Sequence, residues 1–150
     1  LRNAFEDCAI TTDVMVGFPD ETDEDFNESL KFVEKVCFNK VHIFPYSRRE
    51  GTVAAKRPNQ VQSSIKTLRA KQMSEIAEQS FKENLEKQMG KVYPILFERE
   101  NCTEFHQGYA PNYTLVKIPA KNSDKSLRRE IFYVKINGIE KDFCIGEIQK

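Results

Sequence analysis

The residues whose types and spacing could best support binding or catalysis lie around Gly17, where a short apolar run ends in a glycine turn. Asp13 and Glu21 flank this turn, and two carboxylates at that spacing could act as a general acid and a general base. Glycine has no side chain in the way, so a flat ligand could also lie close against the backbone at Gly17. An acid–base pair, a ligand-binding turn and an ordinary loop are the three alternatives here.

Strand and helix patterns surround this turn. The apolar run at residues 14–16 is typical of a buried strand, and Thr22 with Asp25 predicts a capping box at the start of a helix over residues 22–38. Val41 and Ile43 predict a second strand. Strand, helix and strand in this order predict a parallel βαβ unit, in which ligands meet the carboxyl ends of the strands.

Four segments resemble one family, in the order in which that family has them. They are TTDVMVGFPDET at residues 11–22, FPYSRREGT at 44–52, PNQV at 58–61 and QGYAPNY at 107–113. The chain thus resembles the C-terminal portion of radical S-adenosylmethionine tRNA methylthiotransferases of the MiaB/MtaB-like family, including their TRAM domain. The sequence of residues 41–46 is most similar to that of the MtaB branch, which modifies threonylcarbamoyladenosine in tRNA. Asp20 departs from the family's usual glycine and Val53 from its frequent proline, although aspartate tolerates a positive φ.

The resemblance implies an enzyme that adds a methylthio group to N6-threonylcarbamoyladenosine next to the anticodon. The complete enzyme would use S-adenosylmethionine and two [4Fe–4S] clusters, and Met15, Val16 and Gly17 would bind the adenine of the cofactor. The radical chemistry would belong to the cofactor, so we expect no catalytic side chain among these residues. Two alternatives are a stand-alone RNA-binding module without activity and the sister enzyme that modifies an aspartate of a ribosomal protein.

The cysteines do not fit a metal site. Cys8, Cys37, Cys102 and Cys144 are widely and irregularly spaced, without a Cys-x-x-Cys pair or a three-cysteine cluster motif. We therefore expect no metal and no cofactor bound to this chain alone, and no catalysis by it.

Composition and charge restrict the class of protein. The chain of 150 residues is 39% hydrophobic and 31% charged, which is typical of a globular protein. It has neither a membrane-length apolar run nor a signal-peptide pattern, so we expect a cytoplasmic protein without membrane contact. Residues 1–39 hold 3 basic and 10 acidic side chains, whereas residues 40–90 hold 10 and 5. A polyanionic partner would therefore bind beyond residue 39.

The remainder of the chain predicts a long helix and a small β domain. The apolar pattern gives a helix that begins at about residues 59–63 and runs to residue 89, and Gly90 would end it. From residue 91 the period changes to two, over short runs near residues 93–97, 115–118, 131–136 and 143–148, with a turn at Asn137–Gly138. The predicted fold class is α/β plus all-β. Residues 1–89 would form the C-terminal part of a TIM-like partial barrel with the linking helix, and residues 90–150 an OB-like antiparallel barrel, the TRAM domain.

Aromatic and basic residues alternate in the β domain, a composition typical of surfaces that bind single-stranded nucleic acid. With the resemblance, the expected partner is a tRNA anticodon stem-loop, and a basic loop near the active site would contribute Arg48 and Arg49. Open strand edges of the incomplete barrel would also favour a dimer. The residues that we expect to contact RNA are Tyr109, Tyr113, Lys125, Arg128 and Arg129.

Overall fold

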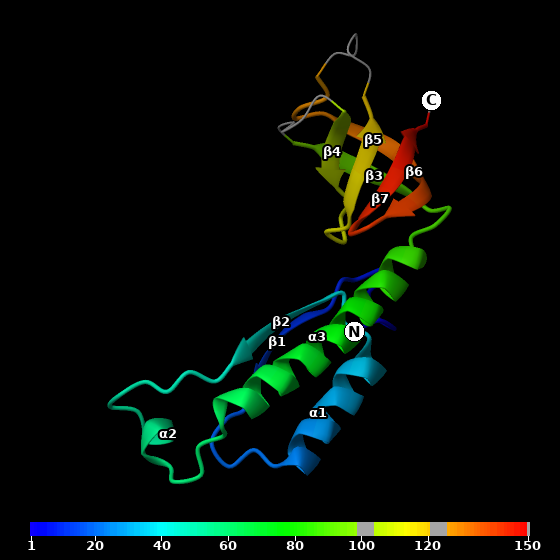
Figure 1. Cartoon of the computed structure of the whole chain (residues 1–150). Helices are drawn as coiled ribbons and strands as arrows, with labels where there is room; N and C mark the ends of the chain where they lie inside the picture. The colour runs from blue at the N-terminus through cyan, green and yellow to red at the C-terminus, as the bar shows by residue number, and fades with distance from the viewer. Residues whose placement is uncertain (99–103, 121–125, 150) are drawn as a thin grey trace. The chain divides into compact units, whose positions relative to one another are not determined.

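The computed structural model describes residues 1–98, 104–120 and 126–149 (Figure 1). Its backbone contacts divide the chain into two compact units. One unit is Ile10–Phe81, and the other joins Leu1–Ala9 to Lys82–Lys150. Within the described residues, no helix is both long and apolar enough to span a membrane.

The first unit contains the expected parallel βαβ arrangement. Strand β1 (Thr11–Val16) is followed by helix α1 (Asp23–Val36) and strand β2 (Lys40–Pro45). The two strands pair in parallel, with Met15 opposite Phe44 and Val16 opposite Pro45. The parallel pairing is confirmed, whereas a TIM-like barrel stays a prediction because the described sheet has two strands.

Helix α1 begins as its sequence predicts. The Thr22 hydroxyl accepts a hydrogen bond from the Asp25 N–H at 3.1 Å, and the Asp25 carboxylate accepts one from the Thr22 N–H at 2.9 Å. These two bonds form the capping box and satisfy backbone donors that the helix leaves free. The hydrogen bonds to Thr22 also lower the pKa of the Asp25 carboxyl.

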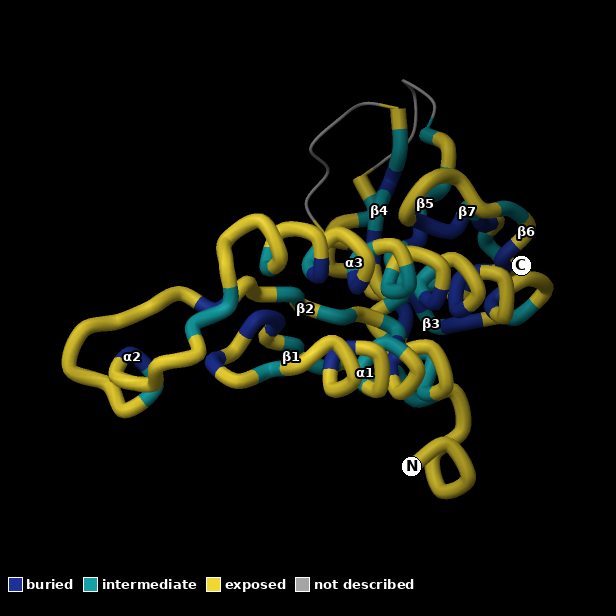
Figure 2. The backbone as a smooth tube through the Cα atoms, turned by 60° about the horizontal axis from the view of Figure 1, so that its bottom comes forward, coloured by how far each residue is buried: buried dark blue, intermediate teal, exposed yellow. Residues whose placement is uncertain are grey.

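A long helix, α3 (Ser63–Glu86), completes the core of the first unit. Val16, Phe26, Val33, Phe38 and Met73 form this core, and Met73 of α3 is fully buried in it. Figure 2 shows buried stretches of backbone on β1, α1 and α3. The basic loop expected at Arg48 and Arg49 leads into a short helix that the sequence analysis missed, α2 (Val53–Lys56), capped by Thr52.

The second unit contains a closed barrel. Its strands are β3 (Val92–Phe97), β4 (Phe105–Tyr109), β5 (Leu115–Pro119), β6 (Ile131–Glu140) and β7 (Phe143–Ile148). They close in the order β3-β4-β5-β7-β6, consistent with an OB-like barrel. Cys144 lies in the interior, where burial raises the pKa of its thiol to about 11.

Two expectations for this barrel are wrong. The barrel is mixed and not antiparallel, because β5 and β7 pair in parallel. Strand directions cannot alternate all the way round a closed ring of five strands, so at least one pair must be parallel. Asn137–Gly138 forms no turn: β6 continues through it with a bulge between Ile136 and Gly138, and a bulge can absorb a residue pair that otherwise favours a hairpin.

Candidate functional site

The turn that follows β1 is built on two residues with positive φ. Gly17 has a φ of +72° and Asp20 a φ of +74°. The Gly17 N–H donates to the Glu21 carboxylate over 2.7 Å, and the Glu21 N–H donates to the Phe18 carbonyl over 3.0 Å. Glu21 therefore fixes the turn through its side chain and its backbone, and its carboxylate is engaged in structure rather than free as an acid or base.

Helix α3 supplies two basic side chains to this turn. A Cβ at Gly17 would lie 2.2 Å from Lys66 Cγ, so only glycine fits against the lysine stem. The Lys66 ammonium donates to the Tyr46 carbonyl at the end of β2 over 3.0 Å. Arg69 donates to the Glu21 carboxylate and, over 3.2 Å, to the Glu21 carbonyl. The carboxyl ends of β1 and β2 are thus both held by α3.

The three residues expected to bind a cofactor lie in different environments. Met15 is 53% exposed and lies beside Phe44, which is 50% exposed, whereas Val16 is 1% exposed and belongs to the core. Gly17 is buried and has no side chain, and its N–H already donates to the Glu21 carboxylate. Alternating strand geometry explains the split, because successive side chains point to opposite faces.

A cavity of about 410 Å³ opens at this end of the sheet. Met15, Phe44 and Arg49 line it, and Arg48 is exposed but is not among the lining residues. The apolar pair fits the flat face of an adenine ring, and Arg49 offers a cation, so these residues fit S-adenosylmethionine. They do not fit an iron–sulfur cluster, since the described part of the chain has no group of three His, Cys, Asp or Glu side chains suited to a metal ion.

The structure brings two of the expected RNA-binding tyrosines together. Tyr109 and Tyr113 line a groove of about 530 Å³ on the barrel, with Leu96 and Ile131 on its apolar wall. Tyr113 is 83% exposed and has a φ of +60°. The Arg129 N–H donates to the Phe97 carbonyl over 2.9 Å. Phe97 follows Leu96 on β3, so the backbone of Arg129 lies near the groove. Arg128 and Arg129 are exposed, and Lys125 lies outside the described residues.

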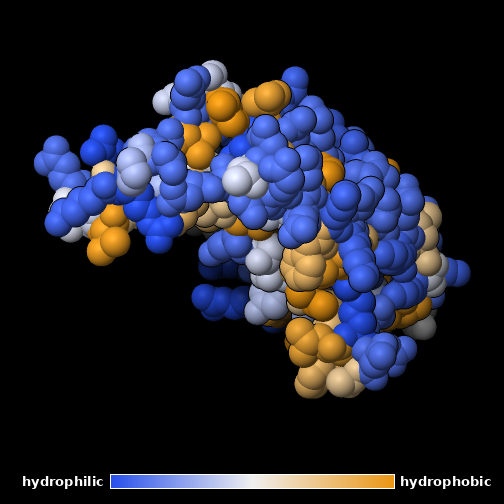
Figure 3. Space-filling model, turned by 90° about the horizontal axis from the view of Figure 1, so that it is seen from below, coloured by the Kyte–Doolittle hydropathy of each residue, from blue (hydrophilic) through white to orange (hydrophobic). Residues whose placement is uncertain are grey.

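Tyr133 was missed by the sequence analysis. It lies opposite Pro94, a residue of the groove wall, and is 63% exposed. The alternation of Ile131, Tyr133 and Lys135 along β6 could have indicated a shared outward face. On the face seen in Figure 3, hydrophobic residues form separate groups among hydrophilic ones.

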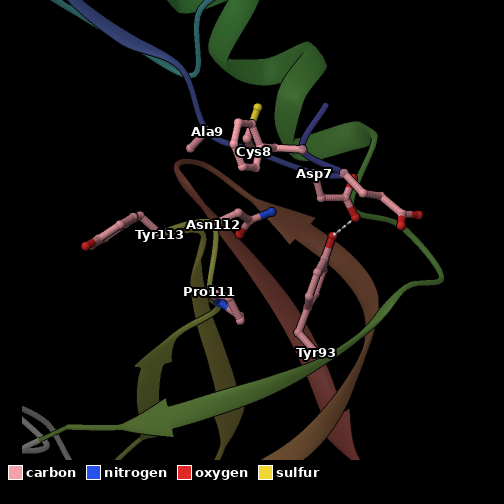
Figure 4. A pocket seen from close by; sticks show the side chains of 9 residues that line it. Asp7, Cys8, Ala9, Tyr93, Pro111, Asn112 and Tyr113 are labelled. Atoms are coloured by element: carbon pink, nitrogen blue, oxygen red, sulfur yellow. Dashed lines mark hydrogen bonds between the residues drawn. The ribbon is translucent and has the colours of Figure 1, made fainter. Parts of the chain in front are cut away.

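A second cavity in this unit, of about 540 Å³, lies between the segment Leu1–Ala9 and the turn that carries Asn112 and Tyr113 (Figure 4). On its wall the Tyr93 hydroxyl lies 3.0 Å from the Asp7 carboxylate and 2.7 Å from the Gln88 side-chain oxygen. Asp7, Tyr93 and Asn112 of its lining are hydrogen-bonded to one another or to Gln88 and Lys91 of the same unit, so this cavity is best explained as part of the packing of the N-terminal segment.

Known proteins with similar sequences decide the family. No family model matches the chain. It is 42% identical over 152 residues to tRNA-2-methylthio-N(6)-dimethylallyladenosine synthase of Caldicellulosiruptor saccharolyticus, which covers 99% of this chain and 31% of the relative. It is 34% identical over 140 residues to threonylcarbamoyladenosine tRNA methylthiotransferase MtaB of Bacillus subtilis, covering 91% of this chain and 30% of the relative. This chain belongs to the tRNA methylthiotransferase family.

The chain spans about a third of the length of these relatives, 31% and 30% respectively. Relatives of both substrate types match it, and the MtaB protein of Chlamydia pneumoniae is 33% identical over 140 residues, or 93% of this chain and 32% of the relative. Modification of threonylcarbamoyladenosine therefore stays a prediction.

The sequence analysis missed Lys66 and Arg69. Both begin the long helix, where basic residues normally indicate a solvated face, and nothing in their spacing indicates a contact with residues 17–23. The sequence did hold one indication of a buried arginine: Arg69 interrupts the apolar stripe of α3 between Ile65 and Met73. Buried arginines are usually paired with carboxylates, and in the fold those of Glu21 and Asp23 are the partners.

Proposed function

We propose that this chain is the C-terminal part of a cytoplasmic radical S-adenosylmethionine tRNA methylthiotransferase. The complete enzyme adds a methylthio group to a hypermodified adenosine next to the anticodon and uses two [4Fe–4S] clusters. The open apolar pair Met15–Phe44 at the carboxyl ends of β1 and β2 carries the proposal, because it offers an adenine-binding wall where this family needs one. We expect the 150-residue chain alone to bind tRNA without catalysis.

When bound, S-adenosylmethionine supplies the methyl group and the radical that activates the C–H bond of the substrate. The side chains of Met15 and Phe44 would exclude water from one face of the adenine, and the backbone near Gly17 would lie at its edge. Val16 is buried in the core and fixes the strand, so that the exposed Met15 beside it keeps its position. Arg49, at the same cavity, provides positive charge for an anionic group of the cofactor or the RNA.

The barrel provides the RNA contact in this proposal. Tyr109 and Tyr113 line one groove and can stack on unpaired bases, while Arg128 and Arg129 are exposed and can contact phosphates. Anticodon loops present unstacked bases of the kind that such surfaces bind.

Threonylcarbamoyladenosine is the preferred substrate in this proposal, on the strength of the sequence at residues 41–46. The match to a dimethylallyladenosine enzyme at 42% identity makes that nucleoside the competing substrate. Nucleoside mass spectrometry of tRNA from cells that lack the gene distinguishes them. Loss of the methylthio group from threonylcarbamoyladenosine supports the proposal, and loss from dimethylallyladenosine contradicts this substrate assignment.

Cofactor binding is tested in the full-length protein. Replacing both Met15 and Phe44 by Ala removes two apolar side chains from the wall, and we expect the Kd for S-adenosylmethionine to rise at least about tenfold. Leu68→Ala, on the exposed surface of α3, is the matched control and should leave the Kd unchanged. A protein that binds the anticodon stem-loop but not S-adenosylmethionine would favour the stand-alone RNA-binding module.

A further inference from the structure

Arg69 of α3 is a buried cation that reaches residues far away in the sequence. It is 5% exposed, although it belongs to a residue type that is seldom buried without partners. Its partners come from the β1–α1 turn, 46 to 48 positions earlier in the chain. The ring of Phe26 lies 5.3 Å from the guanidinium carbon and covers one of its faces.

The guanidinium uses both of its terminal nitrogens on the turn. Nη1 donates to the carbonyl and to the carboxylate of Glu21, at 3.2 and 2.5 Å. Nη2 donates to the carboxylate of Asp23 at 2.7 Å. Burial alone would lower the pKa of Arg69, but the hydrogen bonds to Asp23 and Glu21 outweigh it and raise the pKa. A lysine ammonium could not reproduce this arrangement, because it is a point charge without a planar fork.

One oxygen links Arg69 to the backbone of Gly17. Glu21 Oε2 accepts from Arg69 Nη1 and also from the Gly17 N–H, at 2.7 Å. The orientation of the Gly17 peptide therefore depends on a carboxylate whose own position is set by Arg69. The Glu21 side chain is 14% exposed, so water competes little for these bonds.

We propose that Arg69 is a positioning residue for cofactor binding, which acts through Glu21 on the backbone of Gly17. This inference rests on the proposed function, since it takes the Gly17 turn as part of the S-adenosylmethionine site. Arg69 does not contact the cofactor. It holds Glu21 so that the peptide at Gly17 is presented at a fixed angle beside Met15.

The test uses the full-length protein and measures the Kd for S-adenosylmethionine together with the thermal unfolding midpoint. Arg69→Lys keeps the charge but loses the fork, and Glu21→Gln keeps the shape but loses the charge. By analogy with groups that orient metal ligands, we expect each change to raise the Kd by about 10- to 100-fold. Asp23→Asn is the matched control: it weakens another bond of Arg69, at a carboxylate that is 83% exposed, and should change the Kd less than about twofold.

The double variant Arg69→Lys with Glu21→Gln decides whether the arginine acts through the glutamate. If it does, the double variant binds no more weakly than the weaker single variant, because both changes break one chain of contacts. Additive losses of affinity would overturn the inference. So would variants that unfold at lower temperature but keep the wild-type Kd, since that is the behaviour of a purely structural ion pair.

The two proposals fail in different ways. If the unsubstituted full-length protein does not bind S-adenosylmethionine, the proposed function and the inference are both wrong. If it binds, and Arg69→Lys and Glu21→Gln bind equally well, only the inference is wrong.

Discussion

Asp20 has a left-handed backbone, with a φ of +74°, while its carboxylate forms an ion pair with Arg57 over 3.0 Å. The same carboxylate accepts from the side-chain amide of Asn59 at 2.9 Å, and the Asp20 N–H donates to the Asn59 carbonyl at 3.0 Å. Asp20 thus ties the β1–α1 turn to the segment that precedes α3. The family usually has glycine at this position. Asp20 tolerates a positive φ and adds two side-chain contacts that glycine could not make.

Substitution of Asp20 should separate these two contributions. Asp20→Ala loses the ion pair and places a Cβ in the left-handed region without a polar side chain, so we expect a loss of about 1–2 kcal/mol in the free energy of unfolding. Asp20→Gly loses the exposed contacts with Arg57 and Asn59 but relieves the backbone, so it should stay within about 1 kcal/mol of wild type. Urea unfolding of both variants tests this order, and a glycine variant less stable than the alanine variant would contradict it.

Gly17 and Gly90 form a matched pair for a second prediction. Both have a positive φ, of +72° and +78°, but a Cβ at Gly90 would meet nothing within 4 Å, whereas at Gly17 it would lie 2.2 Å from Lys66 Cγ. Gly90→Ala should therefore cost about 1–2 kcal/mol for the backbone alone. Gly17→Ala should cost more, by about 1–3 kcal/mol of overpacking.

A second substitution checks the cause of that difference. Adding Lys66→Ala to Gly17→Ala removes the clashing Cγ, and chemical denaturation should show that part of the stability returns. If the two glycine variants are equally stable, the close contact with Lys66 has no energetic role.

Asp7 gives the second unit a pH dependence. Its hydrogen bond with Lys91, and a further one with Tyr93, lower the pKa of Asp7 from its ordinary value of 3.8. A carboxyl whose pKa is lower in the folded state stabilises that state above its unfolded pKa, and the contribution disappears as the pH falls through the folded pKa. Wild type should therefore be more stable than Asp7→Asn at neutral pH, by less than about 1 kcal/mol because the pair is largely solvated.

Stability measured from pH 7 to pH 2 tests this sign. The gap between wild type and Asp7→Asn should narrow below about pH 4, near the ordinary carboxyl range. A gap that is constant over this range would show that the carboxylate charge does not contribute.

Local patterns predicted the elements that depend on local physics. The capping box of Thr22 and Asp25 and the parallel pairing of β1 with β2 could be read from spacing alone. Strand β4 could not: its sequence, FHQGY, has a glycine and polar residues and is held by pairing with β3 and β5. Gly108 is needed there because a Cβ would lie 2.3 Å from the Leu96 carbonyl, a constraint that exists only in the folded barrel.

The candidate site shows the same division. The strand over residues 11–16 and the turn at Gly17 could be predicted because a strand that ends in a glycine is a local pattern, whereas cofactor binding at Met15 and Gly17 stays a prediction. Arg69 could not, since its role depends on α3 packing against a turn 46 to 48 residues earlier, and no spacing rule reports such a contact. The burial of Val16 was likewise undetermined, because an apolar run of three residues does not show which face of the strand is covered.

The two-stranded sheet leads to a prediction about association. Within the described residues, β1 and β2 pair only with each other, so each has one edge without a strand partner. Open edges recruit further strands, and we expect this 150-residue chain to form dimers or larger species as its concentration rises. Light scattering over a hundredfold range of concentration measures this, and a monomer throughout the range would rule it out.

RNA binding by the barrel makes two separable predictions, tested in the full-length protein with an anticodon stem-loop as the probe. Arg128 and Arg129 are exposed near the Tyr109–Tyr113 groove and should act through charge. Each phosphate contact on single-stranded RNA contributes about 0.7 to the log–log dependence of affinity on salt. The double Ala variant should thus flatten that slope by about 1.4, whereas Lys71→Ala, an exposed cation on α3, should leave it unchanged.

The tyrosines should behave differently, because stacking involves no ion release. Tyr109→Ala or Tyr113→Ala should weaken binding by about 1–3 kcal/mol at every salt concentration, with the slope preserved. Tyr113 is the more exposed of the two, 83% against 39%, so its ring can cover more of a base and its loss should cost more. Titrations at four salt concentrations separate slope from intercept. An unchanged slope in the double arginine variant would remove that pair from the interface, and equal affinity for duplex DNA would refute recognition of an RNA loop.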